Sequence, residues 1–218
     1  MTVDVLKRNI EQVQSNIARA CSRSGHKVTL VAATKTVPAE LINAAVEFGV
    51  KNVGENRVQE YIEKRDGVIG AYWHFIGTLQ RNKAKYLVGS VPLIQSVNDA
   101  KLAAEIDRLA KKHGIIQDVL IEVNAAGETA KTGAAIESID ELIAYARSLE
   151  NVRVRGLMAV PPKDAEQSVY DKLYSIFSRY ETTDFDILSV GMSGDYEKAI
   201  ASGSNMVRLG SALFGSRT

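Results

Sequence analysis

Residues 28–49 read VTLVAATKTVPAELINAAVEFG and join a short apolar run to an amphipathic stretch. The run from Val28 to Thr34 is rich in β-branched residues, which is typical of a buried strand. Pro38 then suits the first turn of a helix, and Gly49 stands where a helix C-cap belongs. A strand, a short loop and a helix in this order form a βα unit, which favours a parallel sheet.

The same unit recurs along the chain. Further apolar runs occur at 52–56, 72–77, 92–97, 118–124, 154–160, 186–192 and 206–210. Helix-like stretches follow them at 57–65, 79–87, 99–114, 138–150, 165–180 and 194–203, and 211–215 allows at most a short helix. We therefore predict an α/β fold, a single (β/α)8 TIM-type barrel domain over residues 1–218. An open doubly wound sheet is the rival interpretation.

An additional helix is expected at the N-terminus. Val5, Ile10, Val13 and Ile17 recur with helical spacing between Val3 and Arg23, so they lie on one face. This segment is charged and periodic and does not have the apolar stretch of a signal peptide.

Composition and charge narrow the class of protein. The 218 residues include 27 Lys+Arg and 26 Asp+Glu, a formal net charge of +1. This balance offers no electrostatic case for nucleic acid or for an anionic membrane surface. The single cysteine excludes an intrachain disulfide, and no stretch approaches the ~18 apolar residues of a membrane span. We expect a soluble, cytoplasmic protein.

The ends of the last two predicted strands suggest a phosphate site. In a barrel of this kind, chemistry gathers at the C-terminal ends of the strands. There the chain reads GMSGD (191–195) and RLGSA (208–212), each with a serine beside a glycine before a helix or turn. Helix N-termini bind phosphate because their N–H groups are unpaired. Ser193 and Ser211 are therefore either ordinary N-caps or two parts of a phosphate site.

Lys35 and Arg208 extend this hypothesis. An unprotonated lysine attacks carbonyl groups, and desolvation or a nearby cation lowers its pKa. The alternative is that Lys35 reaches past the strand end into water. Arg208 lies inside a short apolar strand, and we expect it to point into the barrel toward an acceptor. A lysine that forms an imine, a phosphate site and an inward arginine together describe a pyridoxal phosphate site.

The sequence resembles the pyridoxal phosphate homeostasis proteins, also called the YggS or proline synthetase co-transcribed homologue (PROSC) family. Their barrel is similar to the N-terminal domain of alanine racemase. The resemblance covers essentially the whole chain. The matching stretches are AATKTVP (32–38), GENRVQE (54–60), WHFIGTLQRNK (73–83), GLMAVPP (156–162), SVGMSGDYEKAI (189–200) and GSNMVRLGSALFG (203–215).

The resemblance implies roles for individual residues. Lys35 would form a Schiff base with the cofactor aldehyde, and Arg208 would meet the pyridine nitrogen. Ser193, Gly210 and Ser211 would hold the phosphate. The residues expected near the ring or its substituents are Asn56, Met158 and Met192, with no metal at the site.

Two further residue types leave alternatives open. His74 either points toward the cofactor or is a satisfied core histidine. Whether another lysine, such as Lys83 or Lys131, offers a second transfer site depends on geometry that the sequence does not give.

The same residues limit the chemistry. An arginine stays protonated, so Arg208 would keep the pyridine nitrogen unprotonated and the ring a weak electron sink. Racemisation needs a second base, which the resembling racemases take from an additional domain that we do not expect here. The resemblance implies a non-catalytic protein that buffers pyridoxal phosphate or delivers it to apo-enzymes and so affects amino-acid and keto-acid pools. Without the additional domain of the racemases, we expect a monomer. The alternatives are a weak amino-acid racemase and a Schiff-base aldolase for a phosphorylated sugar.

Overall fold

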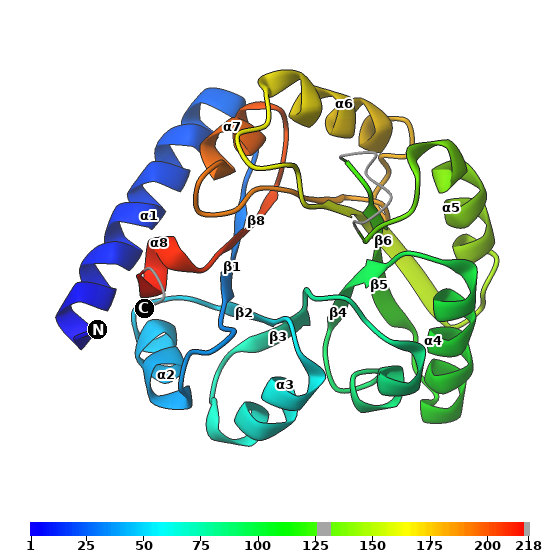
Figure 1. The fold of residues 1–218 in the computed structure, drawn as a ribbon, viewed down its shortest axis with the longest axis horizontal. Helices are drawn as coiled ribbons and strands as arrows, with labels where there is room; N and C mark the ends of the chain where they lie inside the picture. Colours follow the sequence, from blue (N-terminus) through cyan, green and yellow to red (C-terminus); the bar gives the residue numbers. More distant parts are fainter. Residues whose placement is uncertain (126–131, 216–218) are drawn as a thin grey trace.

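The eight parallel strands form a closed barrel surrounded by helices (Figure 1). The computed structural model describes residues 1–125 and 132–215. Each strand pairs with the next in sequence, and β8 pairs back onto β1. This order confirms the predicted barrel and excludes the open sheet. The strands are β1 (Thr29–Ala33), β2 (Asn52–Glu55), β3 (Tyr72–Phe75), β4 (Leu93–Val97), β5 (Gln117–Val123), β6 (Val152–Ala159), β7 (Ile187–Ser189) and β8 (Met206–Leu209).

Helices follow the strands in the predicted order. The α-helices are α1 (Val3–Ser24), α2 (Ala39–Glu47), α3 (Val58–Lys64), α4 (Ala100–His113), α5 (Ile139–Arg147), α6 (Gln167–Ser178), α7 (Tyr196–Ala201) and α8 (Ser211–Phe214). Short 3-10 helices are η1 (Arg65–Gly67), η2 (Arg81–Tyr86) and η3 (Ile136–Ser138). None of the helices in the described ranges is both long enough and apolar enough to cross a membrane.

The helix-like stretch expected over 79–87 is a 3-10 helix. Lys83 N donates to Gln80 O, and Leu87 N donates to Ala84 O, each across three residues. Gly89 then turns the chain with a φ of 78°. A 3-10 helix rises about 2.0 Å per residue against ~1.5 Å for an α-helix, so these six residues cover more of the connection than the same number of α-helical residues would.

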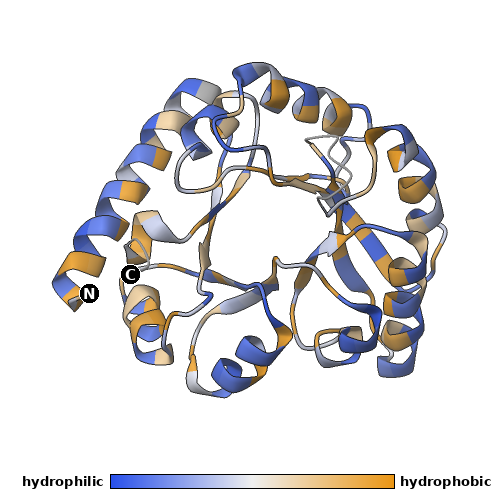
Figure 2. Ribbon diagram, viewed as in Figure 1, coloured by the Kyte–Doolittle hydropathy of each residue, from blue (hydrophilic) through white to orange (hydrophobic). Residues whose placement is uncertain are grey.

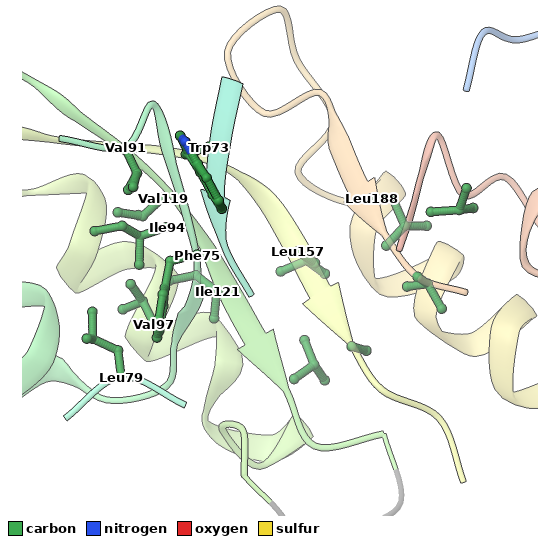
Figure 3. Close-up of a cluster of buried hydrophobic side chains, with 14 of the residues drawn as sticks. Trp73, Phe75, Leu79, Val91, Ile94, Val97, Val119, Ile121, Leu157 and Leu188 are labelled. Atoms are coloured by element: carbon green, nitrogen blue, oxygen red, sulfur yellow. The ribbon is translucent and has the colours of Figure 1, made fainter. Parts of the chain in front are cut away.

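An apolar layer lies between the barrel and its helices (Figure 3). Trp73, Phe75, Ile94, Val119 and Ile121 on β3, β4 and β5 belong to this layer, and all are buried. The helices turn their apolar residues toward it, which gives the alternating bands of Figure 2. Burial of this surface is the main favourable term that closes the barrel, at roughly 25 cal/mol per Å².

Inside the barrel, an apolar layer is followed by a polar one. Val31, Leu93, Leu120, Met158 and Met206 form a buried cluster within the barrel. Because side chains alternate along a strand, the next inward residue lies two positions further toward the C-terminal end. These next residues on β4, β5, β7 and β8 are polar and buried: Gln95, Glu122, Ser189 and Arg208.

Helix α1 lies outside the barrel and packs along α7 and α8 (Figure 1). Its Asn9 Nδ2 donates to the carbonyl oxygen of Leu213 at 2.9 Å, and its Asn16 Nδ2 donates to Tyr196 Oη at 2.9 Å. The helix is capped by the Thr2 side chain at one end and by Gly25, with φ 78°, at the other. These contacts tie the N-terminal helix to the two helices that follow the last strands.

Candidate functional site

A pocket of about 860 Å³ lies at the C-terminal ends of β1, β7 and β8. Its walls include six of the nine site residues predicted from the sequence: Lys35, Met192, Ser193, Arg208, Gly210 and Ser211. Leu41, Phe214 and Met1 add an apolar wall on the side of α1, α2 and α8. Segments that are far apart in sequence therefore meet at the barrel mouth where chemistry was expected.

Lys35 stands between two threonines whose backbone groups are both bonded. Thr34 is fully buried, and its Oγ1 donates to Gly54 O at 3.1 Å and to Glu55 Oε1 at 2.9 Å. Thr36 has a φ of 64°, an unusual value for a β-branched residue, and its N–H donates to Glu60 Oε2 at 2.7 Å. β1 ends at Ala33, and the side chain of Lys35, two residues further on, lines the pocket and is partly buried.

A buried ion cluster behind this loop fixes both sides of Lys35. Lys64 Nζ donates to the carbonyl oxygen of Thr34 at 2.9 Å, to Glu55 Oε1 at 2.7 Å and to Glu60 Oε2 at 3.0 Å. Burial raises the pKa of Glu55, and the Lys64 ammonium offsets part of that rise. Burial also acts to raise the pKa of Glu60, but its bonds to Thr36 and Lys64 outweigh it and lower the pKa. Breaking such a cluster leaves a buried charge unpaired, so its members depend on one another.

On the opposite wall, Ser193 contacts the start of α8. Its Oγ accepts the N–H groups of Gly210 at 3.2 Å and Ala212 at 3.0 Å. The N-cap of α7 is Asp195, not Ser193, and Ser211 is the first residue of α8 rather than its cap. The N-cap interpretation of these two serines is therefore wrong.

The loop that carries Ser193 is itself anchored. Asp195 accepts the N–H of Met192 at 2.6 Å through Oδ1 and the hydroxyl of Tyr170 at 2.7 Å through Oδ2. Burial and the bond to Asp195 raise the pKa of Tyr170, so this phenol stays protonated. Two backbone N–H groups and two serine hydroxyls thus lie together at one end of the pocket.

Arg208 reaches the pocket from β8, as expected for an inward arginine, and only 4% of its surface is exposed. Nη1 donates to the carbonyl oxygen of Ser189 at 2.6 Å and to Ser189 Oγ at 2.7 Å, and Nη2 donates to Ala159 O at 2.9 Å. Burial lowers its pKa to about 10, against the attraction of Glu122 and Asp195. The guanidinium is therefore still a cation at neutral pH.

The other three predicted residues lie elsewhere. Among the described residues, Asn56, His74 and Met158 fall outside the set that lines the pocket. Asn56 is partly buried at the end of β2, and Met158 is 1% exposed in the apolar cluster inside the barrel. His74 is buried and bonded to Gln95 and Asn52, and burial lowers its pKa to about 4. His74 is thus bonded as a core histidine would be, and contact of these three residues with a cofactor stays a prediction.

Comparison with known proteins identifies the family. Residues 9–218 match the family described as alanine racemase, N-terminal domain. The pyridoxal phosphate homeostasis protein of Aquifex aeolicus (strain VF5) is 42% identical over 220 residues, which cover 95% of this chain and 96% of that protein. This chain belongs to the pyridoxal phosphate homeostasis protein family. The family member of Escherichia coli (strain K12) is 36% identical over 226 residues and 97% of each chain.

A solved structure of the family supports the same fold. PipY of Synechococcus elongatus PCC7942, with PLP bound, matches with a TM-score of 0.84 and 27% identity. The match covers 96% of this chain and all of PipY. The fold of nearly the whole chain is thus shared with a protein whose structure was solved with PLP bound.

The pocket residues fit a group such as pyridoxal phosphate. Such a ligand needs a primary amine for its aldehyde, donors for its phosphate and a polar partner for its ring nitrogen. Lys35 supplies the amine, and Arg208 supplies a cationic donor at the base of the pocket. The N–H groups of Gly210 and Ala212 already converge on one oxygen atom, that of Ser193, as they would on a phosphate oxygen.

The sequence analysis missed several residues that support the site. It assigns no role to Glu60, which lies in the stretch GENRVQE (54–60), or to Lys64, which lies in the helix-like stretch 57–65. Gln95 and Ser189 were read only as members of apolar runs, although a polar residue inside such a run is a signal of an inward polar contact. Lys83 is exposed on η2, and Lys131 lies outside the described residues.

Proposed function

We propose that this protein binds pyridoxal 5'-phosphate reversibly and serves in the homeostasis of that cofactor. The observation that carries the proposal is a single pocket that unites Lys35, Arg208 and the Ser193–Ser211 wall. Relatives that are 36–42% identical are named pyridoxal phosphate homeostasis proteins, and PipY was solved with PLP bound. Pocket and relatives thus support the same ligand.

Lys35 holds the cofactor in this proposal. Its unprotonated amine adds to the aldehyde carbon, a C=N bond forms, and one molecule of water leaves, so the bond is a Schiff base that hydrolysis reverses. Ser193 and Ser211 donate their hydroxyl hydrogens to the phosphate oxygens, and the N–H of Gly210, which Ser193 Oγ accepts in this structure, donates to a phosphate oxygen in its place. Met192 lies beside the ring in the same pocket.

Arg208 directs the site toward holding the cofactor rather than using it. Its guanidinium stays charged and donates to the pyridine nitrogen, which therefore keeps its lone pair and stays unprotonated. An unprotonated ring withdraws electrons weakly and gives little help to carbanion chemistry. We therefore assign the protein a non-catalytic role in which it buffers the cofactor and delivers it to apo-enzymes.

A weak amino-acid racemase is the second candidate. The match to the alanine racemase N-terminal domain over residues 9–218 favours it. Racemisation needs a proton donor and acceptor on both faces of the substrate carbon, and Lys35 supplies one of them. Loss of optical rotation in a solution of L-alanine, catalysed by the protein loaded with cofactor, distinguishes this candidate from the carrier.

Two assays test the carrier proposal. Titration with pyridoxal phosphate, followed by visible absorbance, should saturate for the wild type and lose its imine band in Lys35→Ala. Lys112→Ala, which removes an exposed lysine of α4 outside the pocket, is the matched control and should bind as the wild type does. The loaded protein should then restore activity to an aminotransferase stripped of its cofactor. A wild type without an imine band, or a loaded protein that never activates the recipient, would contradict the proposal.

A further inference from the structure

A continuous chain of hydrogen bonds crosses the barrel interior behind Arg208. Arg208 Nη1 donates to Ser189 Oγ at 2.7 Å, and Ser189 Oγ donates to Gln95 Oε1 at 2.7 Å. Gln95 Nε2 lies 3.0 Å from His74 Nδ1, and His74 Nε2 lies 3.2 Å from Asn52 Oδ1. The chain thus links β8, β7, β4, β3 and β2 below the floor of the pocket.

Every donor in this chain points away from Arg208. A guanidinium only donates hydrogen bonds, so Ser189 Oγ must accept from it. The Ser189 hydroxyl in turn donates its hydrogen bond to Gln95 Oε1. The Gln95 amide nitrogen then faces His74 Nδ1, and its second N–H is directed at Met206 Sδ, 3.3 Å away. His74 must therefore accept through Nδ1 and donate through Nε2 to Asn52. These bonds specify one tautomer of a neutral imidazole.

The chain is buried along its length. Gln95 and Ser189 are fully buried, and His74 and Arg208 are 6% and 4% exposed. Buried polar groups are unfavourable unless they are bonded, and the neighbouring layer of the barrel is filled by apolar side chains. Glu122 is the buried carboxylate that faces Arg208, but its Oε1 accepts from Thr132 at 2.7 Å and it takes no part in the chain. Cofactor binding as proposed above leaves Ser189, Gln95 and His74 without a role.

We propose that Ser189, Gln95 and His74 are positioning residues that hold Arg208 in one place and orientation as a donor to the pocket. Networks of this kind rigidify a site when each member is satisfied. The inference rests on the proposed function, because the group that receives the Arg208 hydrogen bond is the ring nitrogen of pyridoxal phosphate. The chain of hydrogen bonds keeps that nitrogen facing a fixed cation, and the nitrogen therefore stays unprotonated.

The first experiment examines the chain without cofactor. The polypeptide contains three histidines, so the imidazole ¹⁵N resonances of the protein stripped of cofactor are readily assigned. His74 should show a bare Nδ1 and a protonated Nε2 at neutral pH. Gln95→Glu replaces the donor with a carboxylate oxygen, so His74 should become doubly protonated at neutral pH. A His74 protonated at Nδ1 and bare at Nε2, or one that stays neutral in Gln95→Glu, would show that this chain of hydrogen bonds does not exist.

The second experiment reads the cofactor. Pyridoxal phosphate labelled with ¹⁵N in the ring reports the hydrogen bond at its nitrogen through the chemical shift. Ser189→Ala and Gln95→Leu should move this resonance, and affinity should fall on the order of 3- to 10-fold for the loss of one or two bonds. Absorbance titrations of the same variants measure that affinity.

Two matched variants control for loss of stability. Ser204 and Gln117 are as deeply buried as Ser189 and Gln95. Ser204 Oγ bonds to backbone groups of Leu188, Val190 and Met206, and Gln117 Nε2 bonds to Val91 O, so neither side chain contacts the hydrogen-bonded side chains behind Arg208. Ser204→Ala and Gln117→Leu should leave the ring resonance in place, and an equal shift in these controls would overturn the positioning role. A wild type that binds no pyridoxal phosphate would instead overturn the proposed function, while the histidine spectra would still decide whether the chain exists.

Discussion

Lys64 Nζ donates a 2.9 Å hydrogen bond to the carbonyl oxygen of Thr34, the residue directly before Lys35. The same ammonium contacts Glu55, which is fully buried, so Lys64→Met leaves that carboxylate without its cation. We expect the free energy of unfolding to fall by about 3 kcal/mol, because breaking a buried ion pair strands a charge. The binding of pyridoxal phosphate should weaken as well, since the loop around Lys35 loses its anchor. Urea denaturation and absorbance titration measure the two effects.

A surface pair provides the control for Lys64. Lys7 and Glu11 are 4.0 Å apart on α1, with side chains that are 54% and 61% exposed. Lys7→Met should change the free energy of unfolding by less than about 0.5 kcal/mol. Equal effects of the two substitutions would show that the buried cluster does not stabilise the Lys35 loop.

Gly77 allows β3 to approach the end of β2. A Cβ atom at this position would lie 2.1 Å from the carbonyl oxygen of Asn56, which is backbone and cannot rotate away. Gly77→Ala should therefore lower the free energy of unfolding by about 2–4 kcal/mol. Gly194→Ala, where a Cβ meets nothing within 4 Å, should change it by less than about 0.5 kcal/mol. Thermal unfolding of both variants checks the contrast, which a stable Gly77→Ala protein would refute.

His74 should make stability depend on pH. Burial lowers its pKa from 6.5 to about 4. Between these values the unfolded chain binds a proton that the folded protein does not, so the free energy of unfolding falls as the pH falls, by up to about 3 kcal/mol. Burial raises the pKa values of Glu55 and Glu122, so these two groups raise the free energy of unfolding as the pH falls. They do so equally in the wild type and in His74→Asn. The difference between wild type and His74→Asn isolates the histidine, and parallel stability curves from pH 7 to pH 4 would contradict this account.

Ser193 should discriminate in favour of a phosphorylated ligand. Its Oγ lies at the point where the N–H groups of Gly210 and Ala212 converge. Ser193→Ala should weaken pyridoxal phosphate binding on the order of 3- to 10-fold and leave the binding of pyridoxal, which has no phosphate, unchanged. Ser178→Ala removes an exposed hydroxyl from α6 and serves as control. Equal losses for both ligands would place the phosphate elsewhere.

Hydrophobic runs and helix signals in the sequence predicted the barrel because each βα unit carries its own pattern. Gly49, expected at a helix C-cap, directly follows Phe48, the C-cap of α2, and has a φ of 94°. The run expected over 186–192 ends as a strand at Ser189, and Gly191 turns away with a φ of 108°. Local patterns thus identify an element more securely than its last residues. The extent of the single domain, the monomeric state and the cytoplasmic location stay predictions.

The supporting residues were not predictable in the same way. Lys64 and Glu60 lie four residues apart on α3, a spacing that equally describes a solvated helix face. Their contact with Thr34 and Thr36 exists only once α3 packs beside the end of β1. Ser189 and Gln95 are 94 residues apart in sequence and meet only because the barrel closes. Long-range polar contacts of this kind leave no periodic signal.

Borohydride reduction of the protein loaded with pyridoxal phosphate, followed by peptide mass mapping, tests the central claim most directly. Reduction converts the imine to a stable secondary amine, so the lysine that held the cofactor carries the added mass of the reduced cofactor. We predict that the adduct maps to Lys35 and that Lys35→Ala retains none in the pocket. An adduct on another lysine, or a protein that acquires neither colour nor adduct, would contradict the assignment of this pocket to pyridoxal phosphate.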